Sequence, residues 1–205
     1  MTQIKIWLIS LICIASFFIS YPVLADSMAK KSPDYPPLVE NLNQLLGFQA
    51  NPEQNGYTSQ ELQKKIDNFK LQKYVLETSE DWGVCRNETD KILGIYGRQP
   101  KKPVQDILFY LAAGEETDDS WDCQGIYIPS DTKVASLDVI TGEPSVLKIV
   151  DGTKLVVTSN PDTGELSLNV PSGLVEVIPF GDTNQSIPNL AQADIDAQTP
   201  NAPTD

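Results

Sequence analysis

The chain has 205 residues, of which 40% are hydrophobic, and it contains no histidine. Without an imidazole base, Ser-His-Asp and Cys-His catalysis are excluded, and catalytic zinc sites lose their usual ligand. The formal net charge is −13. Such a chain repels phosphate backbones, so we expect no nucleic-acid partner.

Residues 1–25 have the three-part pattern of a secretory signal. Lys5 precedes an apolar run over 6–20, and Val23-Leu24-Ala25 supplies short side chains for signal peptidase. An uncleaved anchor is the alternative, because residues 6–24 approach the roughly 20 apolar residues that cross a bilayer. Pro22, just before the cut, favours cleavage. We therefore expect export to a periplasm, a lumen or the extracellular space, with no membrane span after cleavage.

A single α+β domain is predicted over 38–180, and its first part, 38–78, is expected to be helical. Residues 26–37 are polar and rich in proline, which predicts a flexible lead-in. Leucines recur at helical spacing over 38–48, and Thr58 with Glu61 forms a capping box that opens a second helix. Lysines on the second helix form either a solvated face or a binding surface: Lys64, Lys65, Lys70 and Lys73.

After removal of the signal, Cys85 and Cys123 are the two remaining cysteines. In an exported chain they are expected to form a disulfide. A redox-active pair is the alternative, but it needs adjacent cysteines such as C-x-x-C. The connection around Cys85, 79–103, is predicted to be irregular, and residues 91–96 and 104–113 fit either a strand or a short helix.

From residue 125 onward, apolar residues alternate with polar ones, which predicts strands. The turn signals include Asp151-Gly152 and the stretch 160–164, both typical of hairpins. Residues 125–180 are therefore predicted to form an antiparallel β meander, as a small sandwich or an open barrel. The polar stretch 181–205 is predicted to be a disordered tail. The alternating runs cover 134–140, 146–150, 155–157, 166–170 and 174–178.

Two sets of residues are candidate binding sites. An acidic loop offers carboxylates to calcium, although its spacing lacks the order of an EF-hand loop and a solvated loop is the alternative. Aromatic residues near the disulfide form either a platform for sugar or peptide, or part of the core. The acidic set is Glu115, Glu116, Asp118, Asp119 and Asp122; the aromatic set is Trp82, Trp121 and Tyr127. Asn87-Glu88-Thr89 and Asn184-Gln185-Ser186 match the glycosylation pattern.

No motif in the sequence names a reaction, and three classes stay open. A non-catalytic binding or accessory protein of the cell envelope, with an envelope or extracellular protein as its partner, is favoured by the missing catalytic residues and the small β module. A carbohydrate- or calcium-binding module and a small hydrolase that uses paired carboxylates are the alternatives. No cofactor is expected, apart from calcium if the acidic loop binds it.

Overall fold

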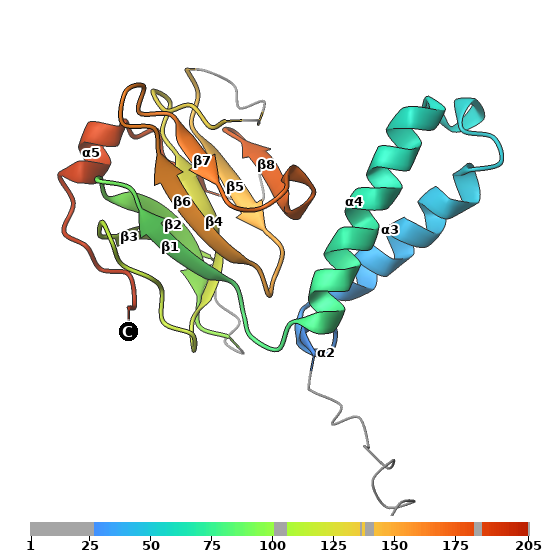
Figure 1. Cartoon of the computed structure of the whole chain (residues 1–205), viewed down its shortest axis with the longest axis horizontal. Helices are drawn as coiled ribbons and strands as arrows, with labels where there is room; N and C mark the ends of the chain where they lie inside the picture. The colour runs from blue at the N-terminus through green and yellow to red at the C-terminus, as the bar shows by residue number, and fades with distance from the viewer. Residues whose placement is uncertain (1–26, 101–105, 136, 138–141, 183–185, 205) are drawn as a thin grey trace, which may run out of the picture.

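The computed structural model describes residues 27–100, 106–135, 137, 142–182 and 186–204. It confirms the predicted α+β class: in these ranges helices come first, eight strands follow in two sheets, and one disulfide joins Cys85 to Cys123. The sheets form a sandwich, and a helical hairpin stands beside it (Figure 1). The predicted signal, 1–25, lies outside the described residues. Within the described ranges, no helix is long and apolar enough to span a membrane.

Residues 27–78 form the arm, a hairpin of α3 (Tyr35–Phe48) and α4 (Ser59–Thr78). The short α2 (Met28–Lys31) precedes it, and the 3-10 helix η2 (Glu53–Asn55) lies in the turn between the two long helices. Aliphatic side chains that recur every three or four residues meet along the hairpin, and they make its own small core. The buried members are Leu42, Leu45, Leu62 and Ile66.

The start of α4 confirms the predicted capping box. The Glu61 N–H donates to Thr58 Oγ1 (3.2 Å), and the Thr58 N–H donates to Glu61 Oε2 (2.9 Å). Two backbone donors at the helix start are satisfied within four residues of sequence. The start of α4 is therefore stabilised by hydrogen bonds within its own sequence, independently of the sandwich.

Within the segment 26–37, predicted to be a flexible lead-in, the described residues 27–37 are largely helical. Met28 is fully buried, and its N–H donates to Ser79 O (2.8 Å), which anchors the segment to the end of α4. Pro36 and Pro37 lie in the first turn of α3, where proline is tolerated because the first N–H groups have no helical partner. Proline content therefore indicated a helix start and was misread as a flexible segment.

The larger sheet has five antiparallel strands in the order β3-β2-β4-β5-β8, and the smaller has three in the order β1-β6-β7. Their facing side chains make the main core, together with the disulfide and Trp121. The strands of the larger sheet are β2 (Leu93–Arg98), β3 (Ile107–Leu111), β4 (Asp122–Ile128), β5 (Ser145–Ile149) and β8 (Val175–Pro179). Those of the smaller sheet are β1 (Val84–Glu88), β6 (Lys154–Ser159) and β7 (Leu166–Leu168).

The connectivity differs from a simple meander in one place. Asp151-Gly152 was predicted to join two paired strands, but it carries the chain from β5 in one sheet to β6 in the other. β5 already lies between β4 and β8, so β6 pairs in parallel with β1 instead. The second predicted hairpin is confirmed, with β6 and β7 antiparallel and Gly164 at φ 70° in the turn. The predicted strand over 134–140 lies largely outside the described residues.

The described part of the predicted disordered tail, 186–204, is packed on the larger sheet. Ile187 and Ile195 are buried, the latter in α5 (Gln192–Asp196). The buried Tyr127 side chain donates its O–H to Pro188 O and Leu190 O (both 2.9 Å). A few apolar residues placed on buried positions are enough to order this segment, although its composition is polar.

Candidate functional site

The disulfide is structural in its setting. The Cα atoms of Cys85 and Cys123 are 5.9 Å apart, and both residues are buried in the sandwich core. The three predicted platform residues do not come together. Trp121 packs edge-on against Phe109 in that core, Tyr127 lies under the tail on the opposite face of the sheet, and Trp82 packs at the base of the arm.

The acidic loop is engaged with neighbouring side chains. Glu116 binds Lys154 (2.8 Å) and Arg86 (3.5 Å), and Asp118 Oδ1 accepts from the Ser120 N–H (2.7 Å). Glu115 and Asp119 are exposed, whereas Asp122 is fully buried in β4. Among the described residues, no group of three or more potential metal ligands lies together. Calcium binding by this loop therefore stays a prediction.

Asp122 and Asp151 form a pair of buried carboxylates in the sandwich, close to the segment 79–83 that connects it to the arm. Gln124 Nε2 donates to both Asp122 Oδ2 (2.7 Å) and Asp151 Oδ1 (3.0 Å), and Arg98 Nε lies 3.4 Å from Asp122 Oδ2. Burial, followed by the charge of Asp151, raises the pKa of Asp122 to about 7. Neither carboxylate lines any of the four cavities described below.

The predicted basic face of α4 is dispersed. Lys65 lies over the Tyr57 ring (5.3 Å to the centroid), and Lys73 binds Glu77 one turn along the helix (2.5 Å). Lys64 and Lys70 are exposed. The four lysines therefore have different local settings.

Three of the four sheet edges form hydrogen bonds with backbone from other segments, at two residues of β1 (Cys85 and Asn87) and at single residues of β7 (Leu166) and β3 (Tyr110). Segment 115–117 lies along β1, 133–135 along β7 and 201–202 along β3. An uncovered edge can pair with another chain, so covering edges prevents such pairing. The fourth edge, β8, has no other segment hydrogen-bonded along it within the described part of the chain. The covering bonds include Thr117 N–H to Cys85 O (2.9 Å), Ala135 N–H to Leu166 O (2.7 Å) and Asn201 N–H to Tyr110 O (3.0 Å).

The pairing of β8 with β5 decides which backbone groups face outward. The Val150 N–H donates to Leu174 O (3.3 Å) just before the strand begins. Because pairing alternates along an antiparallel ladder, residues 176 and 178 also direct their groups to β5. Residues 175, 177 and 179 direct theirs to the open side.

Some of these outward groups have local partners. The Val175 N–H donates to Ser172 O, and Pro179 has no N–H, while its carbonyl accepts from the Asp182 N–H (3.3 Å). Three groups have no hydrogen-bond partner among the described residues: the Val175 carbonyl, and the N–H and carbonyl of Val177. They are spaced as an added strand requires.

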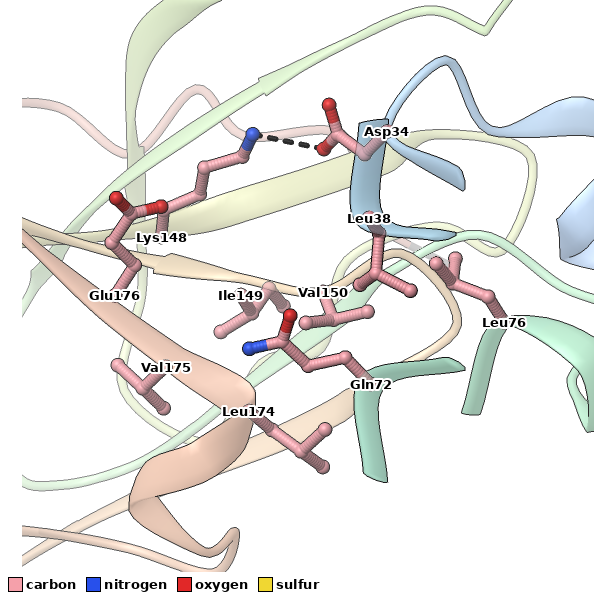
Figure 2. Close-up of a pocket in the computed structure, with 10 residues that line it drawn as sticks. All are labelled: Asp34, Leu38, Gln72, Leu76, Lys148, Ile149, Val150, Leu174, Val175 and Glu176. Carbon is pink, nitrogen blue, oxygen red and sulfur yellow. Dashed lines mark hydrogen bonds and ion pairs between the residues drawn. The ribbon is translucent and has the colours of Figure 1, made fainter. Parts of the chain in front are cut away.

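Cavities lie on both sides of this edge. The junction cavity, of about 180 Å³, lies between the arm and the start of β8, and the inter-sheet cavity, of about 300 Å³, lies beside β7. Val175 lines both of them. Figure 2 shows the junction cavity, with side chains from both regions pointing into it. Its apolar wall is Leu38, Leu76, Ile149, Val150, Leu174 and Val175, and its polar groups are Asp34, Gln72, Lys148 and Glu176.

An ion pair joins the arm to the sandwich across the junction cavity. Lys148 Nζ donates to Asp34 Oδ2 (2.9 Å), as the dashed line in Figure 2 marks. Burial lowers the pKa of Lys148, but the hydrogen bond and charge of Asp34, with help from Asp151 and Glu176, outweigh burial and leave that pKa raised. Glu176 is exposed beside Lys148, and no hydrogen bond or ion pair to another described residue holds its carboxylate. The cavity mouth therefore carries one carboxylate that is available to a ligand.

A larger groove lies among the loops at one end of the sandwich. Its two cavities, of about 410 and 390 Å³, share Lys91, Thr132, Gly164 and Gln192. Gln192 is already engaged: its Nε2 donates to Ile92 O (2.9 Å) and its N–H to Asp131 Oδ1 (3.1 Å). The volume suits a small molecule, but no feature of this groove selects one.

The first glycosylation sequence is closed to modification in the folded chain. Asn87 is fully buried, and its Nδ2 donates to Lys91 O (2.8 Å) and to Leu111 O (3.1 Å). A glycan has to bond to that same nitrogen. Asn184 lies outside the described residues.

Comparison of the chain with protein-family profiles, with curated proteins and with solved structures finds no match. The site is therefore interpreted from its own residues.

The alternating run over 174–178 predicted a strand but not its place at an open edge. The order of strands in a sheet depends on pairing between distant segments, which alternation of apolar residues does not encode. Pro179, directly after the alternating run, was the available signal, because proline in a sheet is confined to edges and strand ends. The pairing of Asp34 with Lys148, 114 residues apart, had no signal in the sequence.

Proposed function

We propose that the chain is an exported, non-catalytic binding protein of the cell envelope that holds an extended segment of a partner protein along β8. The observation that carries this proposal is the difference between edges: other segments form backbone hydrogen bonds with β1, β3 and β7, whereas in the described part of the chain none does so along β8, which keeps three open groups. Strand addition is a recurring mode of peptide recognition. Export is supported by the signal pattern over 1–25 and by the disulfide, which forms in oxidising compartments.

The energetics place most of the affinity in side chains. Each backbone hydrogen bond contributes about 1 kcal/mol net, so three bonds give about 3 kcal/mol. Association itself costs at least about 4 kcal/mol. An apolar side chain buried in a cavity adds about 1.5 to 3 kcal/mol. The cavities on the two sides of β8 supply room for such side chains, which makes specific binding by a short segment feasible.

The test uses proline to remove the one open N–H on β8. Phage-displayed random decapeptides are selected on the immobilised protein from residue 26 onward, on its Val177→Pro variant and on Leu108→Pro. Leu108 is the matched control, because it is also a partly buried residue whose backbone faces outward on an edge strand, β3. We expect the original protein and Leu108→Pro to enrich the same peptides, and Val177→Pro to lose them.

Folding has to be separated from binding in this experiment. Melting temperatures of the three proteins are compared, and the selected peptide is also made with a single N-methyl group at each central position in turn. We expect one of these methyl groups to abolish binding to the unaltered protein, since it removes the donor to Val177 O. Equal enrichment by Val177→Pro, or failure of the original protein to select any peptide, would contradict the proposal.

A further inference from the structure

The partner's chemistry follows from the side chains around the open groups, and it rests on the proposed strand addition. Side chains alternate along a strand, so neighbours on an added strand point to the same side as the β8 residues they face. Val175 and Val177 point into the space between the sheets, where they pack on the core. Glu176 points the other way, toward Lys148 and the junction cavity (Figure 2).

We infer that β8 selects an extended tripeptide with the order apolar, basic, apolar. The two apolar residues face Val175 and Val177 and reach the inter-sheet cavity, whose wall includes Leu137, Leu168 and Val170. The central Lys or Arg faces Glu176. Its aliphatic stem lies along the apolar wall of the junction cavity while its charge meets the carboxylate.

The charges at the cavity mouth favour a cation over an anion. Lys148 is bound to Asp34, and Glu176 acts on it only through its charge, so the Glu176 carboxylate has no hydrogen bond or ion pair with another described residue. The sandwich as a whole, residues 79–205, has 8 basic and 21 acidic residues, a net charge of −13. A basic segment is therefore attracted both at long range and at the contact.

A second copy of this chain fits the same edge poorly. Two β8 strands can pair antiparallel about a two-fold axis in two registers that use the open groups. In one, Glu176 faces Glu176 of the other copy directly, and like charges in that position are destabilising. In the other, the Val175 carbonyl faces Pro179, which has no N–H to donate. Glu176 and Pro179 thus act against self-association and leave the edge to a basic partner.

The test measures binding of the peptides Thr-Val-X-Val-Thr, with X as Lys, Arg, Ala or Glu, at low salt. An opposite-charge pair across strands contributes up to about 1 kcal/mol and a like-charge pair is destabilising, so we expect Lys and Arg to bind about fivefold more tightly than Glu. Glu176→Lys should reverse this order. Glu53→Lys, which makes the same charge change in η2 at the far end of the arm, should leave it unchanged.

The outcomes separate this inference from the function it rests on. If the peptides bind and Val177→Pro abolishes binding, but X makes no difference or Glu176→Lys does not reverse the order, the inferred partner chemistry is wrong and strand addition stands. If Val177→Pro has no effect on peptide binding, strand addition itself is wrong. Formation of a dimer in sedimentation, lost in Val177→Pro, would identify a second copy as the occupant and overturn the inference.

Discussion

The arm and the sandwich differ in their net charge and in the sequence separation of the contacts that form their cores. The arm, residues 27–78, has six basic and six acidic residues, whereas residues 79–205 carry a net charge of −13. The arm closes a core between two helices adjacent in sequence, while the sandwich pairs strands as distant as β1 and β6 and contains the disulfide. From this difference we expect the arm to depend on contacts between neighbouring segments, and the sandwich to fold cooperatively through contacts between distant ones. The candidate binding edge lies where the two meet.

The largest expected effect breaks the sandwich. Replacing Cys85 and Cys123 together by serine opens a loop of 38 residues, which on the chain-entropy model lowers the free energy of unfolding by about 4 kcal/mol. Urea unfolding followed by tryptophan fluorescence measures this loss. The helical signal of the arm should persist to higher urea than the sandwich signal in this variant. Simultaneous loss of both would show that the arm depends on the sandwich.

The second effect is a dependence of sandwich stability on pH. The pKa of Asp122 is raised by burial and by Asp151 to about 7, so the neutral carboxyl is favoured in the folded state. Below about pH 4 the Asp122 carboxyl is protonated in both the folded and the unfolded state, so its burial does not oppose folding. As pH rises to about 7, only the unfolded state ionises freely, and the free energy of unfolding should fall by about 2 to 4 kcal/mol.

Asp122→Asn isolates this contribution in unfolding curves taken from pH 4 to pH 8. The variant should be more stable than the original protein at pH 8, and the difference between them should shrink toward pH 4. Other groups change the stability in the opposite direction, such as Glu116, whose pKa is lowered by its hydrogen bond to Lys154. The contribution of Asp122 is therefore taken from the difference in free energy of unfolding between the variant and the original protein at each pH. Asp119→Asn, at an exposed position, is the control. A difference that does not change with pH would refute the assignment.

The smallest effect is confined to the arm. Thr58→Ala removes the side-chain acceptor at the start of α4, which costs about 1 kcal/mol. Hydrogen exchange should speed up in the first turns of α4 and stay unchanged in the strands. Ser59→Ala, next to it and outside the capping box, is the matched control. Faster exchange in β4 or β5 would show that the two regions unfold together.

The elements of this fold that depend on local chemistry could be predicted from sequence. The capping box of Thr58 and Glu61 placed the start of α4, and the hairpin ending at Gly164 was located by its turn residues. The disulfide followed from the cysteine count. The predictions were wrong where contacts between distant segments determine the structure. Asp151-Gly152 makes a tight turn but its flanking strands belong to different sheets, and the polar tail is ordered by contacts with Tyr110 and Tyr127.

The candidate site shows the same division. The strand that contains Val177 was expected, and so was a sheet edge or loops as the binding surface, but not which edge. Of the two alternatives for the aromatic residues, core packing describes Trp121 and Tyr127, which point to opposite faces of one sheet, an arrangement that their sequence spacing does not reveal. Asp34 lies in the arm and Lys148 in β5, and only the packing of the arm on the sandwich brings them together.

The measurement that tests the central claim most directly is amide hydrogen exchange, resolved by residue, with and without Thr-Val-Lys-Val-Thr. The account predicts that the Val177 amide becomes protected on binding while the outward amide of Leu108 on β3 does not change. Unchanged exchange at Val177, with protection appearing instead at Lys91 or Gln192 in the loop groove, would contradict it and move the binding site to the other end of the sandwich.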